Sequence, residues 1–289
     1  MRFCRFNDNR LGVVEGDQVR DVSTVLEELP SYRWPFPHGD VFMAHFGELR
    51  PKTEALAKTA PAKPLSEVKL LSPIANPGKI IGAPVNYRAH LDEVLDDSAL
   101  HHGMKIKPIA EAGVFLKATS SLIGPSDAIV VDWPDRRTDH EIELAVVIGK
   151  RGFRIREEEA LDHVAGYTIG LDMTIRGPEE RSYRKSLDTF SVLGPWLVTA
   201  DEIADPNNLN FELTIGGETR QKANTNMLIF NVQKLIEFAS KAYTLYPGDV
   251  IMTGTPEGVA PVAAGDILHA SFEGIGSIDV RVVGNWDRR

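Results

Sequence analysis

The sequence predicts a β-rich α+β fold. From Lys69 onward, short runs of branched apolar residues are separated by Gly, Pro and Asp turns, which is the pattern of strands in a sheet. Two stretches of this part stand out as helical. Arg156–Val164 has an acidic first turn, and Ile229–Tyr243 carries apolar residues at helical spacing. A doubly wound fold would need a helix after nearly every strand, so a mostly β fold is favoured.

The segment up to Pro73 has a different texture and is predicted to form a small N-terminal α/β domain with a linker, residues 1–73. We expect short strands at Arg2–Phe6, Leu11–Glu15 and Gln18–Asp21, and a helix within Val41–Lys58. Residues 74–289 would form the larger domain. Its expected strands are Lys79–Ile81, Ala128–Val131, Glu141–Ile148, Ala165–Leu171, Leu209–Ile215, Val250–Thr253 and Ile278–Val283.

Composition narrows the class of partner and the compartment. The chain of 289 residues has a net charge of −9 and a pI of about 5.4, which argues against nucleic acid because phosphate binding needs a basic surface. Cys4 is the single cysteine, so no intrachain disulfide can form and a reducing cytoplasm is expected. Neither a signal-peptide pattern nor an apolar run of membrane-spanning length is present, so no membrane partner is expected.

Acidic residues in the run Asp139–Gly149 suggest a metal site. In a strand, Glu141 and Glu143 would point to the same side, and two carboxylates in an apolar strand repel each other and resist burial. Asp172, near the end of the next expected strand, would add a third oxygen ligand. Such a set suits Mg²⁺ or Mn²⁺ and, without His or Cys, zinc less well. The alternative is a half-exposed strand with solvated glutamates.

Upstream, His90 and Glu93 are three residues apart and would share one face of a helical turn. A carboxylate that orients an imidazole in this way prepares it to take a proton from water. The polar stretch Leu91–Gly113 that follows is either a lid over the site or a plain surface excursion.

Several cations could accompany the acids and bind an anionic substrate. Arg88, Lys117, Arg176 and Lys185 favour a small anionic oxo acid, although solvated surface positions are the usual alternative for such residues. Gly254, next to Thr255, would let backbone N–H groups approach an anion.

Taken together and in order, these segments resemble the fumarylacetoacetate hydrolase family over roughly Lys79 to Val283. The motifs are Asn86-Tyr87-Arg88-x-His90-x-x-Glu93, Phe115-Leu116-Lys117, Glu141-x-Glu143 with the apolar run to Gly149, Gly166-Tyr167-Thr168 with Asp172 and Thr174, Lys185-Ser186-x-Asp188-Thr189-Phe190, Leu193-Gly194-Pro195-Trp196 and Thr253-Gly254-Thr255-Pro256-x-Gly258-Val259. The resemblance implies a mixed β-sandwich roll, a homodimer and a catalytic Mg²⁺ or Mn²⁺.

The resemblance also implies roles for particular residues. It assigns metal binding to Glu141, Glu143 and Asp172, water activation to His90 and Glu93, and substrate contacts to Arg176, Lys185 and Thr255. The sequence departs from the family at Gly177-Pro178-Glu179, where Glu179 replaces the usual glutamine, and the long Leu91–Gly113 segment is unlike the short members. Both differences concern the part of the pocket that would hold the far end of the substrate.

The resemblance predicts a metal-dependent hydrolase that cleaves a C–C bond in an acylpyruvate or similar 1,3-diketo or 2-oxo acid. His90 would deprotonate the attacking water, and Lys185 would stabilise the oxyanion that develops. Enolate stabilisation serves other reactions equally well. A 2-oxo acid decarboxylase and an isomerase of unsaturated oxo-diacids therefore remain alternatives, and a non-catalytic metal-binding protein is the alternative outside enzymes.

Overall fold

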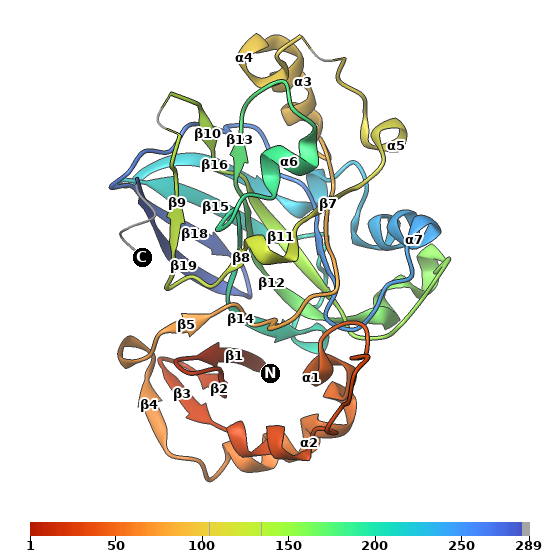
Figure 1. The fold of residues 1–289 in the computed structure, drawn as a ribbon, viewed down its shortest axis with the longest axis vertical. Helices are drawn as coiled ribbons and strands as arrows, with labels where there is room; N and C mark the ends of the chain where they lie inside the picture. The colour runs from red at the N-terminus through yellow and green to blue at the C-terminus, as the bar shows by residue number, and fades with distance from the viewer. Residues whose placement is uncertain (104, 134, 285–289) are drawn as a thin grey trace.

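The computed structural model describes residues 1–103, 105–133 and 135–284, and it confirms the β-rich α+β fold. The described strands form one twelve-stranded sheet, one five-stranded sheet and one two-stranded sheet (Figure 1). The path of the large sheet is β4-β3-β2-β1-β14-β12-β11-β17-β6-β7, with β5 paired to β1 and β8 paired to β14.

The bounds of the strands match most of the predicted runs. The large sheet contains β1 Arg2–Phe6, β2 Arg10–Glu15, β3 Gln18–Asp21, β4 Ala62–Pro64, β5 Leu70–Leu71, β6 Ile80–Gly82, β7 Phe115–Lys117, β8 Leu122–Ile123, β11 Ile142–Ile148, β12 Val164–Asp172, β14 Ser191–Thr199 and β17 Val250–Met252. The five-stranded sheet contains β9 Ala128–Val130, β15 Asn210–Ile215, β16 Glu218–Asn224, β18 Ile267–Phe272 and β19 Gly276–Val283, and the pair is β10 Thr138–Asp139 with β13 Thr174–Ile175.

The described helices are short. The α-helices are α1 Val41–Ala44, α2 Phe46–Ala57, α3 Arg88–Asp96, α4 Ser98–His101, α5 Ile109–Ala112, α6 Arg181–Lys185 and α7 Val232–Ala242. The 3₁₀ helices are η1 Ser23–Glu28, η2 Leu65–Glu67, η3 Thr119–Ser121, η4 Glu157–His163, η5 Ala200–Glu202 and η6 Thr225–Met227. The predicted helix Arg156–Val164 is thus the 3₁₀ helix η4, because Val164 already begins β12 and leaves little room for a longer helix.

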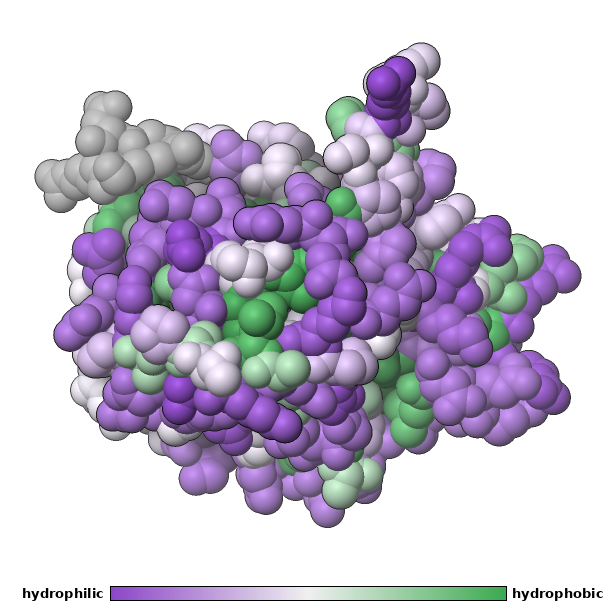
Figure 2. All heavy atoms as spheres, turned by 90° about the horizontal axis from the view of Figure 1, so that it is seen from below, coloured by the Kyte–Doolittle hydropathy of each residue, from purple (hydrophilic) through white to green (hydrophobic). Residues whose placement is uncertain are grey.

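The N-terminal part is joined to the rest through the large sheet. β1 pairs with β14, with Phe3 opposite Leu197, so the first strands continue the sheet that carries the central strands. In Figure 1 this part, with α1 and α2, lies at the end of the molecule opposite α3 and α4. Seen from that end, the surface is mostly hydrophilic, with apolar side chains gathered in a small area near its centre (Figure 2). A domain boundary at residue 73 stays a prediction.

The central strand β11 is buried along its whole length. Leu144 and Val146 belong to one hydrophobic cluster, whereas the alternate residues Ala145 and Val147 belong to another on the opposite face of the strand. Both faces of this strand are therefore covered, which makes it a rigid support for side chains at its end. None of the described helices is long and apolar enough to span a membrane.

Candidate active site

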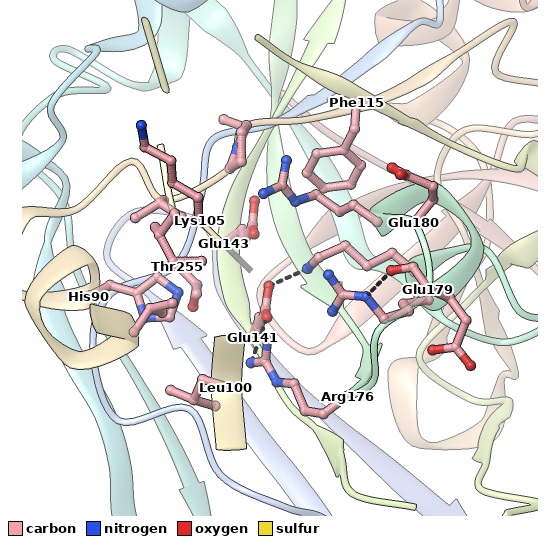
Figure 3. Close-up of a pocket in the computed structure, with 18 residues that line it drawn as sticks. His90, Leu100, Lys105, Phe115, Glu141, Glu143, Arg176, Glu179, Glu180 and Thr255 are labelled. Carbon is pink, nitrogen blue, oxygen red and sulfur yellow. Dashed lines mark hydrogen bonds and ion pairs between the residues drawn. The ribbon is translucent and has the colours of Figure 1, made fainter. Parts of the chain in front are cut away.

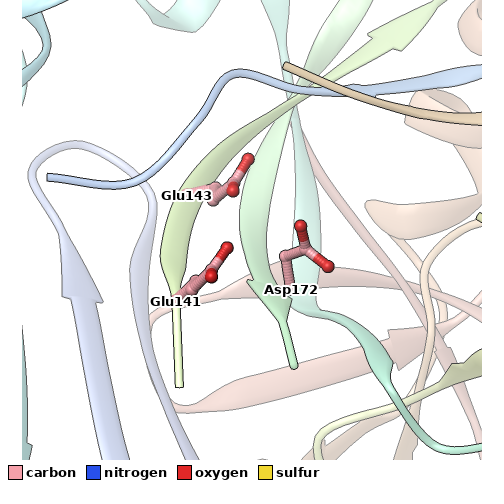
Figure 4. A group of neighbouring side chains, drawn as sticks. All are labelled: Glu141, Glu143 and Asp172. Carbon is pink, nitrogen blue, oxygen red and sulfur yellow. The ribbon is translucent and has the colours of Figure 1, made fainter. Parts of the chain in front are cut away.

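Three carboxylates meet where β11 begins and β12 ends. Glu141 immediately precedes β11, Glu143 lies two residues further on the same side, and Asp172 is the last residue of β12. The strands are antiparallel, and the Asp172 N–H donates to the Glu141 carbonyl at 2.9 Å. One carboxylate oxygen of each residue lies within 4.8 Å of the other two, and all three residues are at most 4% exposed (Figure 4).

Glu141 is neutralised by two buried cations. Lys185 Nζ lies 2.5 Å from Glu141 Oε2, and Arg176 Nη2 lies 3.1 Å from Glu141 Oε1. Burial alone would raise the pKa of Glu141, but these positive charges outweigh it and lower the pKa to about 2. Arg176 also holds Asp139, with Nε 2.8 Å from Oδ2. Glu141 is therefore ionised and fixed in position.

Asp172 contacts two lysines, one of which, Lys185, it shares with Glu141. Lys117 Nζ is 2.5 Å from Asp172 Oδ1, and Lys185 Nζ is 2.7 Å from Oδ2. Burial lowers the pKa of Lys117, and the Asp172 charge opposes that effect. Lys185 also donates to Thr174 Oγ1 at 2.7 Å, so all three of its ammonium protons have an acceptor.

Glu143 differs from the other two acids. No described cation makes an ion pair with it, and its Oε2 accepts a hydrogen bond from the Gly254 N–H at 2.6 Å. Burial, and next the charge of Asp172, raise the pKa of Glu143 well above its usual value. A buried acid with this deficit of positive charge, beside two further carboxylates, fits a divalent ion that prefers oxygen ligands, such as Mg²⁺ or Mn²⁺. Glu141, Glu143 and Asp172 would hold it.

His90 and Glu93 form the predicted pair on α3. His90 Nδ1 lies 2.8 Å from Glu93 Oε2, and the other oxygen of Glu93 accepts from the Gly258 N–H at 2.9 Å. The carboxylate is therefore anchored on both sides and fixes the imidazole plane. His90 is 5% exposed, and its Nε2 has no hydrogen-bond partner among the described residues. Nε2 is thus the ring nitrogen that remains available to accept a proton.

A cavity of about 170 Å³ connects these groups. In Figure 3, His90 and Glu179 lie on opposite sides of Glu141, and Phe115 and Thr255 also line the cavity. Leu100, Lys105 and Ile106 line the cavity from the segment Leu91–Gly113, whose Met104 lies outside the described residues. These residues place part of the segment along one side of the site.

The structure brings most of the predicted residues to the cavity, but not all. Lys185, Arg176 and Thr255 line it. Lys117 lies behind Asp172 and is not part of the lining, and Gly254 contributes only its N–H to Glu143. Arg88 is the first residue of α3, is exposed, and does not line the cavity.

Sequence reasoning missed other lining residues. Arg181 and Arg184 on α6 line the cavity. Glu179, which the sequence already placed in this pocket, lines it too, and its two oxygens accept from Arg136 at 2.9 and 2.8 Å. The signal that could have found the arginines is their spacing with Lys185, which places all three on one side of a helical turn. Arg136 is thus the counter-ion of Glu179, the residue at which the sequence departs from the family.

Known proteins of one family are similar to this chain along most of its length. The model of the fumarylacetoacetate (FAA) hydrolase C-terminal family matches residues 79–283. The maleylpyruvate hydrolase of Aquipseudomonas alcaligenes is 54% identical over 284 residues, which cover 98% of this chain and 99% of that protein. A mitochondrial oxaloacetate tautomerase of Homo sapiens, FAHD2A, is 39% identical over 242 residues, which cover 79% of this chain and 74% of that protein.

A solved structure is similar over the whole chain. Maleylpyruvate hydrolase from Sphingobium sp. SYK-6, in complex with manganese(II) and pyruvate, has a TM-score of 0.83 and 40% sequence identity, and the match covers 99% of this chain and 100% of that one. The predicted family and the β-rich fold are both confirmed. The chain belongs to the fumarylacetoacetate hydrolase family.

Proposed function

We propose that this chain is a metal-dependent hydrolase that cleaves the C–C bond of an acylpyruvate to give pyruvate and the free acid. The observation that carries the proposal is one cavity lined both by two members of a buried carboxylate triad and by a histidine fixed by a carboxylate. The relatives named maleylpyruvate hydrolases support the hydrolytic reaction and the use of a divalent metal.

Glu141, Glu143 and Asp172 would hold Mg²⁺ or Mn²⁺. When bound, the ion would supply positive charge that polarises the oxygens of a 2-oxo acid and favours its enolate form. The protein contributes a rigid support, because β11 is buried on both faces, and Gly254 fixes the carboxylate of Glu143 through its N–H.

His90 would act as the general base. Its Nε2 takes a proton from water, the water oxygen attacks the acyl carbonyl, and the bond between that carbon and the pyruvate methylene carbon breaks. The bonding electrons pass to the pyruvate half, whose methylene carbon then takes up a proton. Glu93 keeps the Nδ1 proton in place and stabilises the imidazolium that forms. The atoms of one water molecule are thus divided between pyruvate and the released acid.

Lys185 would stabilise the oxyanion of the attacked carbonyl. Its ammonium group already donates to Glu141, Asp172 and Thr174, so it must release one of these acceptors before it can donate to the substrate. Neutralisation of the carboxylates by a divalent ion would make that release easier. Arg176 and Thr255 line the same cavity and would position the substrate. Arg88 and Lys117 lie outside the lining, and we assign them no substrate contact.

Maleylpyruvate or a close analogue is the proposed substrate, by similarity to the relatives of that name. A panel of acylpyruvates, oxaloacetate and unsaturated oxo-diacids, offered to metal-stripped and Mn²⁺-restored protein, tests this function. The expected result is metal-dependent loss of the diketone absorbance with one pyruvate formed per substrate. Release of CO₂ would indicate a decarboxylase, and enol–keto conversion without pyruvate would indicate a tautomerase like the 39% identical relative.

We also propose a homodimer in the cytoplasm and a domain boundary near residue 73. The buried, single Cys4 is compatible with a reducing compartment. Light scattering after gel filtration would give twice the chain mass of 31.9 kDa for a dimer.

Limited proteolysis that cuts near Pro73 and leaves a stable larger fragment would support the domain boundary.

A further inference from the structure

One wall of the cavity carries two arginines that form no ion pair with an acid among the described residues. Arg181 and Arg184 lie three residues apart on α6 and both line the cavity. Neither makes an ion pair with any described residue, although the Nε of Arg184 donates to the Glu179 carbonyl at 2.9 Å. Arg184 is only 6% exposed and Arg181 is half-buried, so both guanidinium groups have lost part of their hydration.

Some of the other charges near this wall already have partners. Arg176 is paired with Asp139 and Glu141, and Glu179 is held by Arg136. Glu180 remains as an exposed acid on the same wall, without an ion pair among the described residues. Two arginines against one exposed acid leave a surplus of one positive charge.

The guanidinium group of Arg181 is available to bind an anion. Its guanidinium carbon lies 5.6 Å from the centre of the Phe115 ring, so the ring supports the guanidinium group from β7. Burial lowers the pKa of both arginines, and the neighbouring Arg176 adds to this effect at Arg184. An anion that reaches partly buried cations of like sign stabilises them, and a planar guanidinium matches a carboxylate in two parallel hydrogen bonds.

The carboxylate of the 2-oxo acid half of the substrate would not reach this wall. It would lie beside Glu141, Glu143 and Asp172, where a divalent ion supplies the compensating charge. The unmatched charge on α6 therefore calls for a second carboxylate, and in an acylpyruvate that carboxylate can only be on the acyl group. We propose that Arg181, supported by Arg184, binds this second carboxylate and restricts the substrates to acylpyruvates with an acidic acyl group.

This inference rests on the proposed function, and its test compares two substrates in one enzyme. Maleylpyruvate has a carboxylate on its acyl group, and acetylpyruvate has none. In Arg181→Met, the ratio of kcat/KM for maleylpyruvate to kcat/KM for acetylpyruvate should fall about 10- to 100-fold, the usual worth of hydrogen bonds to a charged group. Arg181→Lys keeps the charge but not the planar guanidinium group, so its ratio should lie between those of Arg181→Met and the wild type.

Two further variants serve as controls. Arg156→Met removes an equal charge from an exposed position beside η4 and should leave the ratio unchanged. Lys105→Met removes an exposed cation that lines the cavity from the segment Leu91–Gly113. If Lys105→Met lowers the ratio and Arg181→Met does not, the second carboxylate binds Lys105 and the proposal is wrong. An equal loss on both substrates in Arg181→Met would also overturn it, because Arg181 would then serve the shared pyruvate half.

Failure of the proposed function can be told apart from failure of this inference. If the Mn²⁺-loaded wild type turns over no acylpyruvate, the hydrolase proposal fails, and binding of maleate decides the inference. Maleate should then raise the Tm of the wild type more than acetate does, and Arg181→Met should lose that difference. Equal responses of the two proteins to maleate would remove the role of Arg181.

Discussion

Glu143→Gln is expected to stabilise the metal-free protein while it abolishes the stabilisation by metal. The substitution keeps the shape of the side chain and an oxygen that can accept from the Gly254 N–H, but it removes one of three negative charges. Repulsion among the buried like charges of a functional site lowers the free energy of unfolding, whereas an ordinary buried strand has no such repulsion.

The size of the effect follows from the distances. Two like charges within 4.8 Å of each other repel each other by at least about 3.5 kcal/mol at an effective dielectric constant of about 20. Glu143 has two such neighbours, and the positive charge of Lys185 and uptake of a proton by the carboxyl offset most of the repulsion. We therefore expect a gain of about 1–3 kcal/mol in the free energy of unfolding, or about 2–8 °C in Tm.

The assay is thermal and urea unfolding in EDTA and then in excess Mn²⁺. Wild-type protein should gain about 2.7 kcal/mol when Mn²⁺ is present at about 100 times its Kd, and Glu143→Gln should gain much less. Glu218→Gln, at an exposed position on β16, is the control for loss of one acid. If Glu143→Gln is less stable than wild type in EDTA, or gains as much from Mn²⁺, the account of the carboxylates is wrong.

Three further outcomes are expected. Glu93→Gln should lower kcat about 10- to 100-fold with little change in KM, measured by steady-state kinetics, because the imidazolium loses its partner; an unchanged kcat would remove the pair from the mechanism. Gly254→Ala should lower the free energy of unfolding, measured in urea, by about 2–4 kcal/mol, because a Cβ at φ +97° would lie 2.8 Å from the Asn86 Cβ. Gly47 has open space around it, so Gly47→Ala should not lower the free energy of unfolding. Burial raises the pKa of Cys4 to about 12, so the thiolate is scarce at about pH 8. Cys4 should therefore react with a thiol reagent at that pH only after the protein is unfolded. Rapid labelling of the native protein would contradict its burial.

The parts of the site that could be predicted from the sequence are local. The spacing of Glu141 and Glu143 places them on one side of a strand, and the spacing of His90 and Glu93 places them on one face of a helix. These relations depend only on the period of the backbone, and the structure contains both. The same reasoning could have excluded Arg88, because a residue two positions from His90 on a helix points about 200° away.

The remaining features depend on segments that meet only in the folded chain. Lys185 contacts Glu141 from 44 positions away, and the Gly254 N–H reaches Glu143 from 111 positions away. No periodic pattern specifies such pairs. The burial of β11 on both faces likewise follows from its central place in the large sheet, between β12 and β17. The charge surplus on α6 becomes visible only when the partners of every nearby acid are known.

The most direct test of the central claim is hydrolysis of maleylpyruvate in H₂¹⁸O by the Mn²⁺-restored enzyme, followed by mass spectrometry of both products. The account predicts one ¹⁸O atom in the new carboxylate of the released acid, one pyruvate per substrate, and loss of turnover in EDTA and in His90→Ala. Turnover without pyruvate, release of CO₂, or full activity in EDTA would contradict it.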